Sequence, residues 1–246
     1  MRVRALRDRK ERRAQGLFTV EGHKVVGEAY ASGADIVDCF VRSDVEVPAE
    51  WRAEVVASAA LERMSSMRTA PGVLAVVRYA PPETPEPAEL KLMLERQSSM
   101  PGFLALDGLS DPGNMGALMR SAEWFGFAGI LVSPQTVDAV HPKVVQAAMG
   151  SSFRVPVWEV ELPAYLSQVH AAGVPVVGFD MQANSMYADS TAARGILVVG
   201  GESHGVSPEV KAACSELCSI PGRGRAESLN AAIAGSIAMS EWHRRS

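Results

Sequence analysis

After residue 100 the chain alternates short, uninterrupted apolar runs with longer segments that carry apolar residues at helical spacing. Continuous apolar runs of this length predict strands buried on both faces, and the segments between them predict amphipathic helices. This alternation favours an α/β fold with a mostly parallel sheet covered by helices on both faces. The predicted strands are residues 103–106, 130–132, 174–179, 196–200 and 217–220, and the predicted helices are 115–125, 142–149, 163–171 and 229–242.

A smaller α/β unit precedes a proline-rich break in the chain. Four prolines fall within seven residues after position 80, which excludes a helix or a central strand there. We therefore expect a small α/β domain in residues 1–80, a proline-rich linker with a lead-in helix in 81–100, and a larger α/β domain in 101–246. Within the small domain the patterns predict a helix at 22–31 and strands at 17–20, 36–41, 54–57 and 73–77.

The composition is that of an ordinary globular protein, with 47% hydrophobic and 21% charged residues in 246. The sequence has no run of about 18 apolar residues, and its first segment is too charged for a secretory signal, so we expect a cytoplasmic protein with no membrane segment. The three cysteines form no disulfide framework, and no second Cys/His pair lies near Cys214 and Cys218 to complete a zinc site. We expect no metal.

Positive charge is concentrated at the N-terminus, although the whole chain has a formal charge of −4. Residues 1–13 contain seven Arg or Lys against Asp8 and Glu11, so this segment carries +5 and the rest of the chain −9. Such a segment is consistent with a solvated helix face or a disordered tail. The more specific interpretation is a contact to an RNA backbone.

Three predicted strands are followed by loops rich in glycine and polar residues, and ligands of parallel sheets bind beyond the carboxyl ends of strands. In the first loop Asn114 is expected to cap a helix that carries Arg120. In the second, Glu202 stands among glycines, and the third enters a small-residue helix that Ser228 or a neighbour would cap. None of the loops is a dinucleotide-binding fingerprint or a P-loop, which disfavours a nicotinamide or ATP site. Taken singly, each has a purely structural explanation.

Taken together and in this order, the loops resemble the three motifs of the SpoU (TrmH) family of RNA 2′-O-ribose methyltransferases. The resemblance spans about residues 102–243, and residues 149–157 also look like the family's stretch between the first two motifs. The N-terminal part resembles the family's L30e-like substrate-binding domain. The chain departs from the pattern at Gly222, where many members have Met, and at Ala231 and Ala232, where a Val-Ser pair is common. The matching residues are Asn114, Gly116 and Arg120, then Gly200, Glu202 and Gly205, then Ile220, Pro221, Ser228, Leu229 and Asn230.

The resemblance implies a catalytic domain with a deep C-terminal trefoil knot, a homodimer, and S-adenosylmethionine as the methyl donor. It places the cofactor contacts at Gly200, Ile220, Ser228 and Leu229. The implied catalytic residues are Arg120, Asn114, Glu202 and Asn230. Because a guanidinium is effectively always protonated, we expect Arg120 to grip a phosphate and stabilise the developing alkoxide rather than to act as the base.

The expected substrate is a structured RNA, with 23S ribosomal RNA ahead of transfer RNA. We expect the first 13 residues to help hold its phosphates. Three alternatives stay open on the sequence: a tRNA 2′-O-methyltransferase, an enzyme that methylates a base, and a catalytically inactive RNA-binding module.

Overall fold

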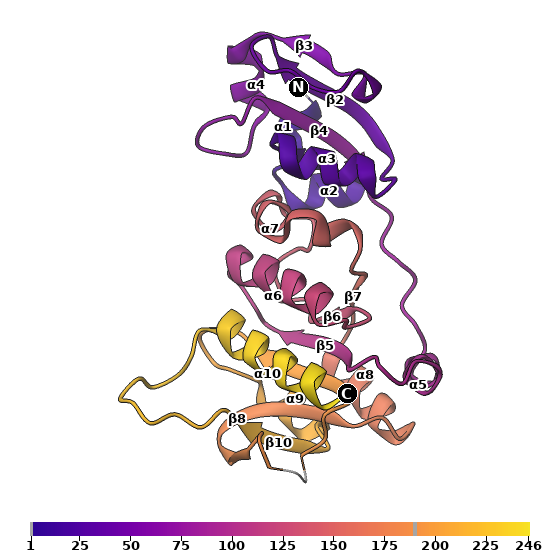
Figure 1. Cartoon of the computed structure of the whole chain (residues 1–246), viewed down its shortest axis with the longest axis vertical. Coiled ribbons are helices and arrows are strands. Elements are labelled where there is room, and N and C mark those ends of the chain that lie inside the picture. Colours follow the sequence, from indigo (N-terminus) through magenta and orange to yellow (C-terminus); the bar gives the residue numbers. More distant parts are fainter. Residues whose placement is uncertain (1, 189–190) are drawn as a thin grey trace. The chain divides into compact units, whose positions relative to one another are not determined.

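The computed structural model describes residues 2–188 and 191–246 (Figure 1). They form two compact units. One unit joins the chain up to Pro81 with Asp138–Arg154, and the other joins Pro82–Val137 with Val155–Ser246. In this part of the chain no helix is long and apolar enough to cross a membrane.

The first unit is built on a four-stranded sheet in the order β1-β4-β2-β3, in which β4 runs antiparallel to β1 and β2 while β3 is parallel to β2. The core lies on both faces of β4, because Val73, Ala75 and Val77 pack in one apolar cluster and Leu74 and Val76 in another. This two-sided burial explains the continuous apolar run that predicted the strand. The strands are β1 (Leu17–Glu21), β2 (Ile36–Arg42), β3 (Glu54–Val56) and β4 (Val73–Arg78).

Four helices and a 3-10 turn complete the N-terminal part of this unit. The sequence predicted α3 with its bounds, and for the later strands it predicted only that helical stretches lie between them, as α4 does between β3 and β4. The two basic helices at the N-terminus are ordered, so the disordered-tail interpretation of this segment is wrong. The elements are α1 (Arg2–Ala5), α2 (Arg9–Gln15), α3 (His23–Ala31), η1 (Ala49–Trp51) and α4 (Ser58–Met64).

The segment Asp138–Arg154 packs with the first unit, although we expected it in the second domain. It contains α7 (Pro142–Ala148) and the 3-10 helix η2 (Met149–Phe153). Its side chains Val140 and Val145 belong to the same apolar cluster as Phe18. The helix was predicted, but its amphipathic pattern shows only that one face is buried and not which sheet covers it.

The second unit is an α/β structure around a six-stranded sheet in the order β10-β8-β9-β5-β6-β7. Every neighbouring pair is parallel, which confirms the predicted fold class. All six residues of β9 are buried, as the uninterrupted apolar run predicted. The strands are β5 (Gly102–Asp107), β6 (Ile130–Val132), β7 (Val157–Glu159), β8 (Val176–Ser185), β9 (Gly195–Gly200) and β10 (Glu216–Ser219).

Helices cover both faces of this sheet. Side chains of α5 (Pro87–Arg96), α8 (Leu162–Ala171) and α9 (Pro208–Ala213) pack in one cluster with Phe103 of β5. Helix α10 (Ala231–Arg245) lies across β9 and beside α6 (Pro112–Trp124), as Figure 1 shows. The close approach of these two helices depends on Gly235, because a Cβ there would lie 2.5 Å from the Leu118 side chain.

The structure corrects the expected start of α6 and agrees with the expected start of α10. Helix α6 begins at Pro112 and is capped by Asp111, whose Oδ1 accepts from the backbone N–H of Asn114, so Asn114 lies inside the first turn and is not the cap. Proline suits the first helical position because its missing N–H would be unsatisfied there anyway. Helix α10 is capped by Asn230, a neighbour of the expected Ser228.

Candidate active site

The loops after β5 and β9 leave the same edge of the sheet, because these strands are parallel and Asp107 pairs with Gly200. The backbone of Gly201 donates to the carbonyl of Asp107 over 2.8 Å. A Cβ on Gly201 would lie 2.4 Å from the carbonyl oxygen of Gly108. A Cβ on Gly200 would lie 1.9 Å from the carbonyl carbon of Gly205. Both positions therefore require glycine. A side chain at Gly201 would collide with the loop after β5, and one at Gly200 would collide with its own loop.

Three of the four expected catalytic residues meet above this edge. The Asn114 amide nitrogen donates to Glu202 Oε1 over 2.6 Å. The Asn230 amide nitrogen donates to Asn114 Oδ1 over 3.0 Å. These residues come from the first turn of α6, the loop after β9 and the cap of α10, so the structure brings the three sequence motifs to one place.

The hydrogen bonds give this chain of amides a fixed direction. Asn230 Oδ1 accepts from the backbone N–H groups of Ala232 and Ile233, over 2.9 and 3.2 Å, as it caps α10. Its NH₂ group must therefore face Asn114, and the Asn114 NH₂ group must face the Glu202 carboxylate. An amide NH₂ has two protons, and each of these amides uses one within the chain. Within residues 2–188 and 191–246 the second N–H of each has no hydrogen-bond acceptor, so it can be donated to a ligand.

Glu202 is held as a carboxylate by this arrangement. Its partial burial raises its pKa, but hydrogen bonds from Asn114, from its own backbone and from Ser110 outweigh that effect, so the net pKa is lower than the ordinary value. Ser110 was not among the residues expected from the sequence. Its place in the same strand-exit loop as Asn114 is the only signal of its role that the sequence holds.

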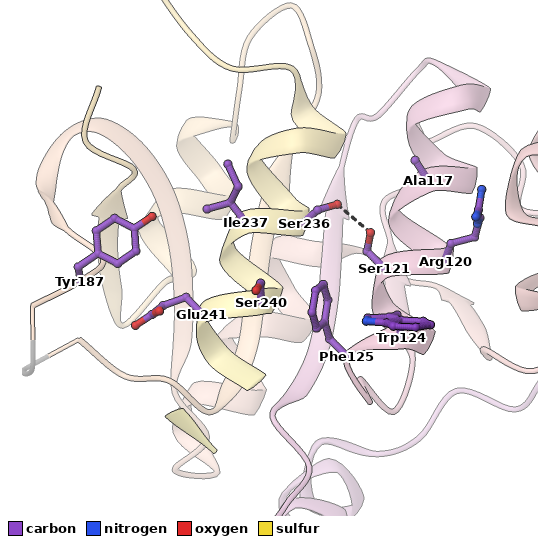
Figure 2. A pocket seen from close by; sticks show the side chains of 10 residues that line it. All are labelled: Ala117, Arg120, Ser121, Trp124, Phe125, Tyr187, Ser236, Ile237, Ser240 and Glu241. Carbon is purple, nitrogen blue, oxygen red and sulfur yellow. Dashed lines mark hydrogen bonds between the residues drawn. The ribbon is translucent and has the colours of Figure 1, made fainter. Parts of the chain in front are cut away.

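Arg120, the fourth expected residue, lies elsewhere on α6. Six residues after Asn114, it points about 120° away around the helix axis. Within the described chain no hydrogen bond joins it to Asn114, Glu202 or Asn230. It lines a pocket of about 710 Å³ between α6 and α10. Figure 2 shows Arg120 and Trp124 projecting from α6, with Tyr187 on the opposite side of the pocket.

A hydrogen bond between the hydroxyls of Ser121 and Ser236, 2.8 Å apart, joins the two helices at the pocket (Figure 2). Its lining combines a guanidinium with aromatic side chains, one of which, Trp124, is 83% exposed. The full lining is Ala117, Arg120, Ser121, Trp124, Phe125, Tyr187, Ser236, Ile237, Ser240 and Glu241.

The loop after β10 carries three of the four positions expected to contact the cofactor. Ile220 is half-buried, Ser228 is exposed, and the Leu229 side chain is 47% exposed. Residues 221–229 are all exposed, and a Cβ at Gly222 or Gly224 would meet nothing within 4 Å. This loop therefore presents its backbone to the outside. The described residues hold no group of three or more His, Cys, Asp or Glu that could bind a metal ion.

Comparison with known families agrees with the motifs. Residues 101–240 match the SpoU rRNA methylase family, and residues 1–75 match the MRM3-like substrate-binding domain. The chain belongs to the SpoU rRNA methylase family, which confirms the resemblance found in the sequence.

Characterised and uncharacterised relatives match along most of the chain. The 23S rRNA (guanosine(2553)-2′-O)-methyltransferase RlmP of Bacillus subtilis is 29% identical over 94% of this chain and 90% of its own length. An uncharacterised tRNA/rRNA methyltransferase of Mycobacterium tuberculosis is 31% identical over 99% of this chain and 79% of its own length.

Solved structures show the same fold. A TrmH-family protein from Porphyromonas gingivalis is 34% identical, with a TM-score of 0.80 over 100% of this chain and 96% of that one. The SpoU methyltransferase AviRb of Streptomyces viridochromogenes, solved in complex with AdoMet, is 26% identical with a TM-score of 0.81 over 99% and 96% of the two chains.

Proposed function

We propose that this protein transfers a methyl group from S-adenosylmethionine to a ribose 2′-hydroxyl of structured RNA, with 23S rRNA as the substrate. The observation that carries the proposal is the directed chain from Asn230 through Asn114 to Glu202, which leaves two N–H donors beside an ionised carboxylate. Donors and an acceptor at fixed positions suit the recognition of sugar hydroxyls. The 2′-O-methyltransferase RlmP, which matches nearly the whole chain, supports the same reaction.

The loop after β10 fits S-adenosylmethionine. Its exposed backbone offers N–H and C=O groups to an adenine edge, and Ile220 and Leu229 offer apolar surface to the ring. We assign Gly200, Ile220, Ser228 and Leu229 to the cofactor site, with Gly200 acting through the fold of its turn. When bound, S-adenosylmethionine supplies a sulfonium-activated methyl group. The AviRb structure in complex with AdoMet supports this cofactor.

The protein's own residues orient and stabilise the ribose. Asn114, Glu202 and Asn230 position the hydroxyl, so that little conformational freedom is lost during attack. Arg120 holds a phosphate of the nucleotide and stabilises the negative charge that develops on the 2′-oxygen. Because a guanidinium does not accept a proton, the hydroxyl proton leaves to a phosphate oxygen or to water.

A homodimer would place a second subunit beside Arg120. On α6 and α10, Trp124 is 83% exposed and Ile233 is 53% exposed. We propose that a second copy of the chain covers this surface. Because Arg120 points about 120° away from Asn114 around α6, it would then lie on the surface where the two copies meet.

We propose separate roles for the parts of the chain. We assign RNA binding to residues 1–80, the linker to 81–100 and methyl transfer to 101–246. The match of residues 1–75 to a substrate-binding domain supports the first assignment. We also propose the trefoil knot in the C-terminal segment. It is supported by the path of the chain, which leaves β10 at one edge of the sheet and returns as α10 over β9 in its interior.

Among RNA substrates the coverage of the solved structures favours rRNA over tRNA. A structure described as concerning 2-OH methylation of C/U34 on tRNA covers only 58% of this chain, with a TM-score of 0.52. An rRNA methyltransferase from Sinorhizobium meliloti covers 99% with a TM-score of 0.80. We therefore give the N-terminal domain a part in the choice of substrate, since the rRNA enzyme matches the whole chain and the tRNA structure little more than half of it.

Mapping of 2′-O-methyl groups in cells with and without the gene tests this proposal. We expect one ribose methylation to disappear from 23S rRNA while the tRNA pattern is unchanged. Loss of a tRNA modification alone would assign the enzyme to tRNA, and loss of a base modification alone would exclude ribose chemistry. An unchanged pattern in all RNA would favour an inactive RNA-binding module.

A further inference from the structure

Ser110 holds the Glu202 carboxylate from the side opposite Asn114. Its hydroxyl donates to Glu202 Oε2 over 3.2 Å, and its backbone N–H points to the same oxygen over 3.4 Å. Asn114 donates to the other oxygen, Oε1, over 2.6 Å. Both carboxylate oxygens are therefore fixed, each by a different point of the segment that joins β5 to α6.

Hydrogen bonds to both oxygens define the plane of the Glu202 carboxylate. The last torsion of a glutamate side chain is broad, so one hydrogen bond to one oxygen leaves the group free to rotate. The second contact removes that freedom. Ser110 is itself well placed for this task, because the next residue, Asp111, caps α6 by accepting from the Asn114 backbone over 2.8 Å. The two donors to Glu202 thus belong to one locked turn.

Ser110 lies outside the three family motifs, and no expectation from the sequence included it. We propose that Ser110 is a positioning residue of the methyl-transfer site, whose hydroxyl sets the plane of the Glu202 carboxylate and so the direction in which its oxygens face Asn114 and a bound ribose. This inference rests on the proposed function for its effect on catalysis, but the hydrogen bond itself can be tested without any RNA.

The hydroxyl is the important donor of the pair. The backbone contact is longer and survives any substitution, whereas the side-chain contact is lost in Ser110→Ala. Because Ser110 is exposed, its removal leaves no cavity in the core and does not disturb folding. The remaining backbone donor and solvent replace part of the lost interaction, so we expect a moderate effect, roughly three- to tenfold on the rate of transfer.

The test compares the wild-type protein with Ser110→Ala and Ser110→Thr, and uses Ser167→Ala on the exposed surface of α8 as a matched control. Methyl transfer to 23S rRNA is measured as kcat and as KM for S-adenosylmethionine. We expect Ser110→Ala to lower kcat while KM for the cofactor stays the same, Ser110→Thr to stay within about twofold of the wild type, and Ser167→Ala to match the wild type.

A second readout follows the Glu202 carboxyl by ¹³C NMR during a pH titration of the same proteins. Loss of a donor to the ionised form raises the pKa of Glu202 in Ser110→Ala, and the hydroxyl of Ser110→Thr restores it. A wild-type protein that transfers no methyl group would refute the proposed function, while the titration would still decide the role of Ser110. If Ser110→Ala left the Glu202 titration unchanged, or left an active enzyme with its full kcat, the positioning role would be wrong.

Discussion

The side chain of Asn230 donates a hydrogen bond to Oδ1 of Asn114 over 3.0 Å, although 116 residues separate them in the sequence. Asn230 has two functions at once, since its oxygen caps α10 and its nitrogen joins the site. The start of one helix is thereby linked directly to the first turn of another. The polarity of the site follows from this link, because the capping bonds decide which way the amide faces.

Asn230→Asp separates the two functions. Aspartate caps helices as well as asparagine does, so we expect the melting temperature to stay within a few degrees of the wild type. The substitution places a carboxylate oxygen against Asn114 Oδ1, where a donor was, and we expect transfer to fall by roughly thirtyfold or more. Asn230→Ala is the matched comparison, because it loses the cap as well, at a cost of about 1 kcal/mol. Full activity in a folded Asn230→Asp protein would exclude the directed amide chain from catalysis.

The homodimer is tested through the exposed surface of α6. We expect the wild-type protein to sediment as a dimer and Trp124→Glu to shift it to the monomer, because a charge at the centre of an apolar interface is left desolvated. We also expect the rate of methyl transfer to fall in Trp124→Glu as the dimer is lost. Leu92→Glu on α5, another large exposed apolar position at 46%, serves as the control and should leave the dimer intact. A wild-type protein that is monomeric yet active would contradict the proposal.

Arg12 is part of the core of the first unit, so it is not among the side chains of residues 1–13 that could hold RNA. Its side chain is 2% exposed and lies 2.6 Å from Asp138, which is 14% exposed. It also donates to the carbonyls of Leu6 and Arg7. Because Arg12→Met removes the ion-pair partner of a largely buried carboxylate, we expect a loss of about 3 kcal/mol in urea unfolding.

The control for Arg12 is Arg78→Met, which removes an ion pair with Asp35 whose partners are 58% and 63% exposed. We expect it to cost less than about 1 kcal/mol. If the two variants lost the same free energy of unfolding, the buried Arg12 pair would contribute no more to stability than the exposed pair.

RNA binding by the N-terminal segment has to be tested at its exposed residues. Deleting residues 1–13 would also remove Arg12 and the fully buried Leu6, so weaker binding could reflect unfolding. Arg4 and Lys10 are exposed. We expect the double substitution to alanine to reduce the slope of log K against log salt by roughly 1 to 2, measured by binding titrations with rRNA fragments. An unchanged slope with intact folding would show that these side chains do not contact phosphates.

The sequence predicted the parallel sheet well because strands buried on both faces need continuous apolar runs, as in β9. The resemblance to the SpoU motifs predicted Asn114, Glu202 and Asn230 as one site, and the shared edge of the parallel sheet explains why the loops after β5 and β9 lie together. The sequence pattern misplaced the cap of α6, since Asp111 and Asn114 are both good caps and only Pro112 distinguishes them.

What the sequence could not predict depends on contacts between distant segments. The pairing of Arg12 with Asp138 spans 126 residues, and a count of charges does not show which of them are buried. The packing of Val140 and Val145 with Phe18 was not predicted either, because an amphipathic pattern does not show which surface the apolar face packs against. The contact of Ser110 with Glu202 joins two loops that are adjacent only once the sheet has formed.

Methyl transfer in solution tests the central claim most directly. The protein is incubated with S-adenosylmethionine that carries an isotopically labelled methyl group and with 23S rRNA lacking its modifications, and the RNA is then digested to nucleosides and analysed by mass spectrometry. We predict the label in a 2′-O-methylnucleoside, and at least about a hundredfold less of it with Arg120→Ala. Label on a base, no label in the RNA, or equal labelling by Arg120→Ala would contradict the mechanism proposed for this site.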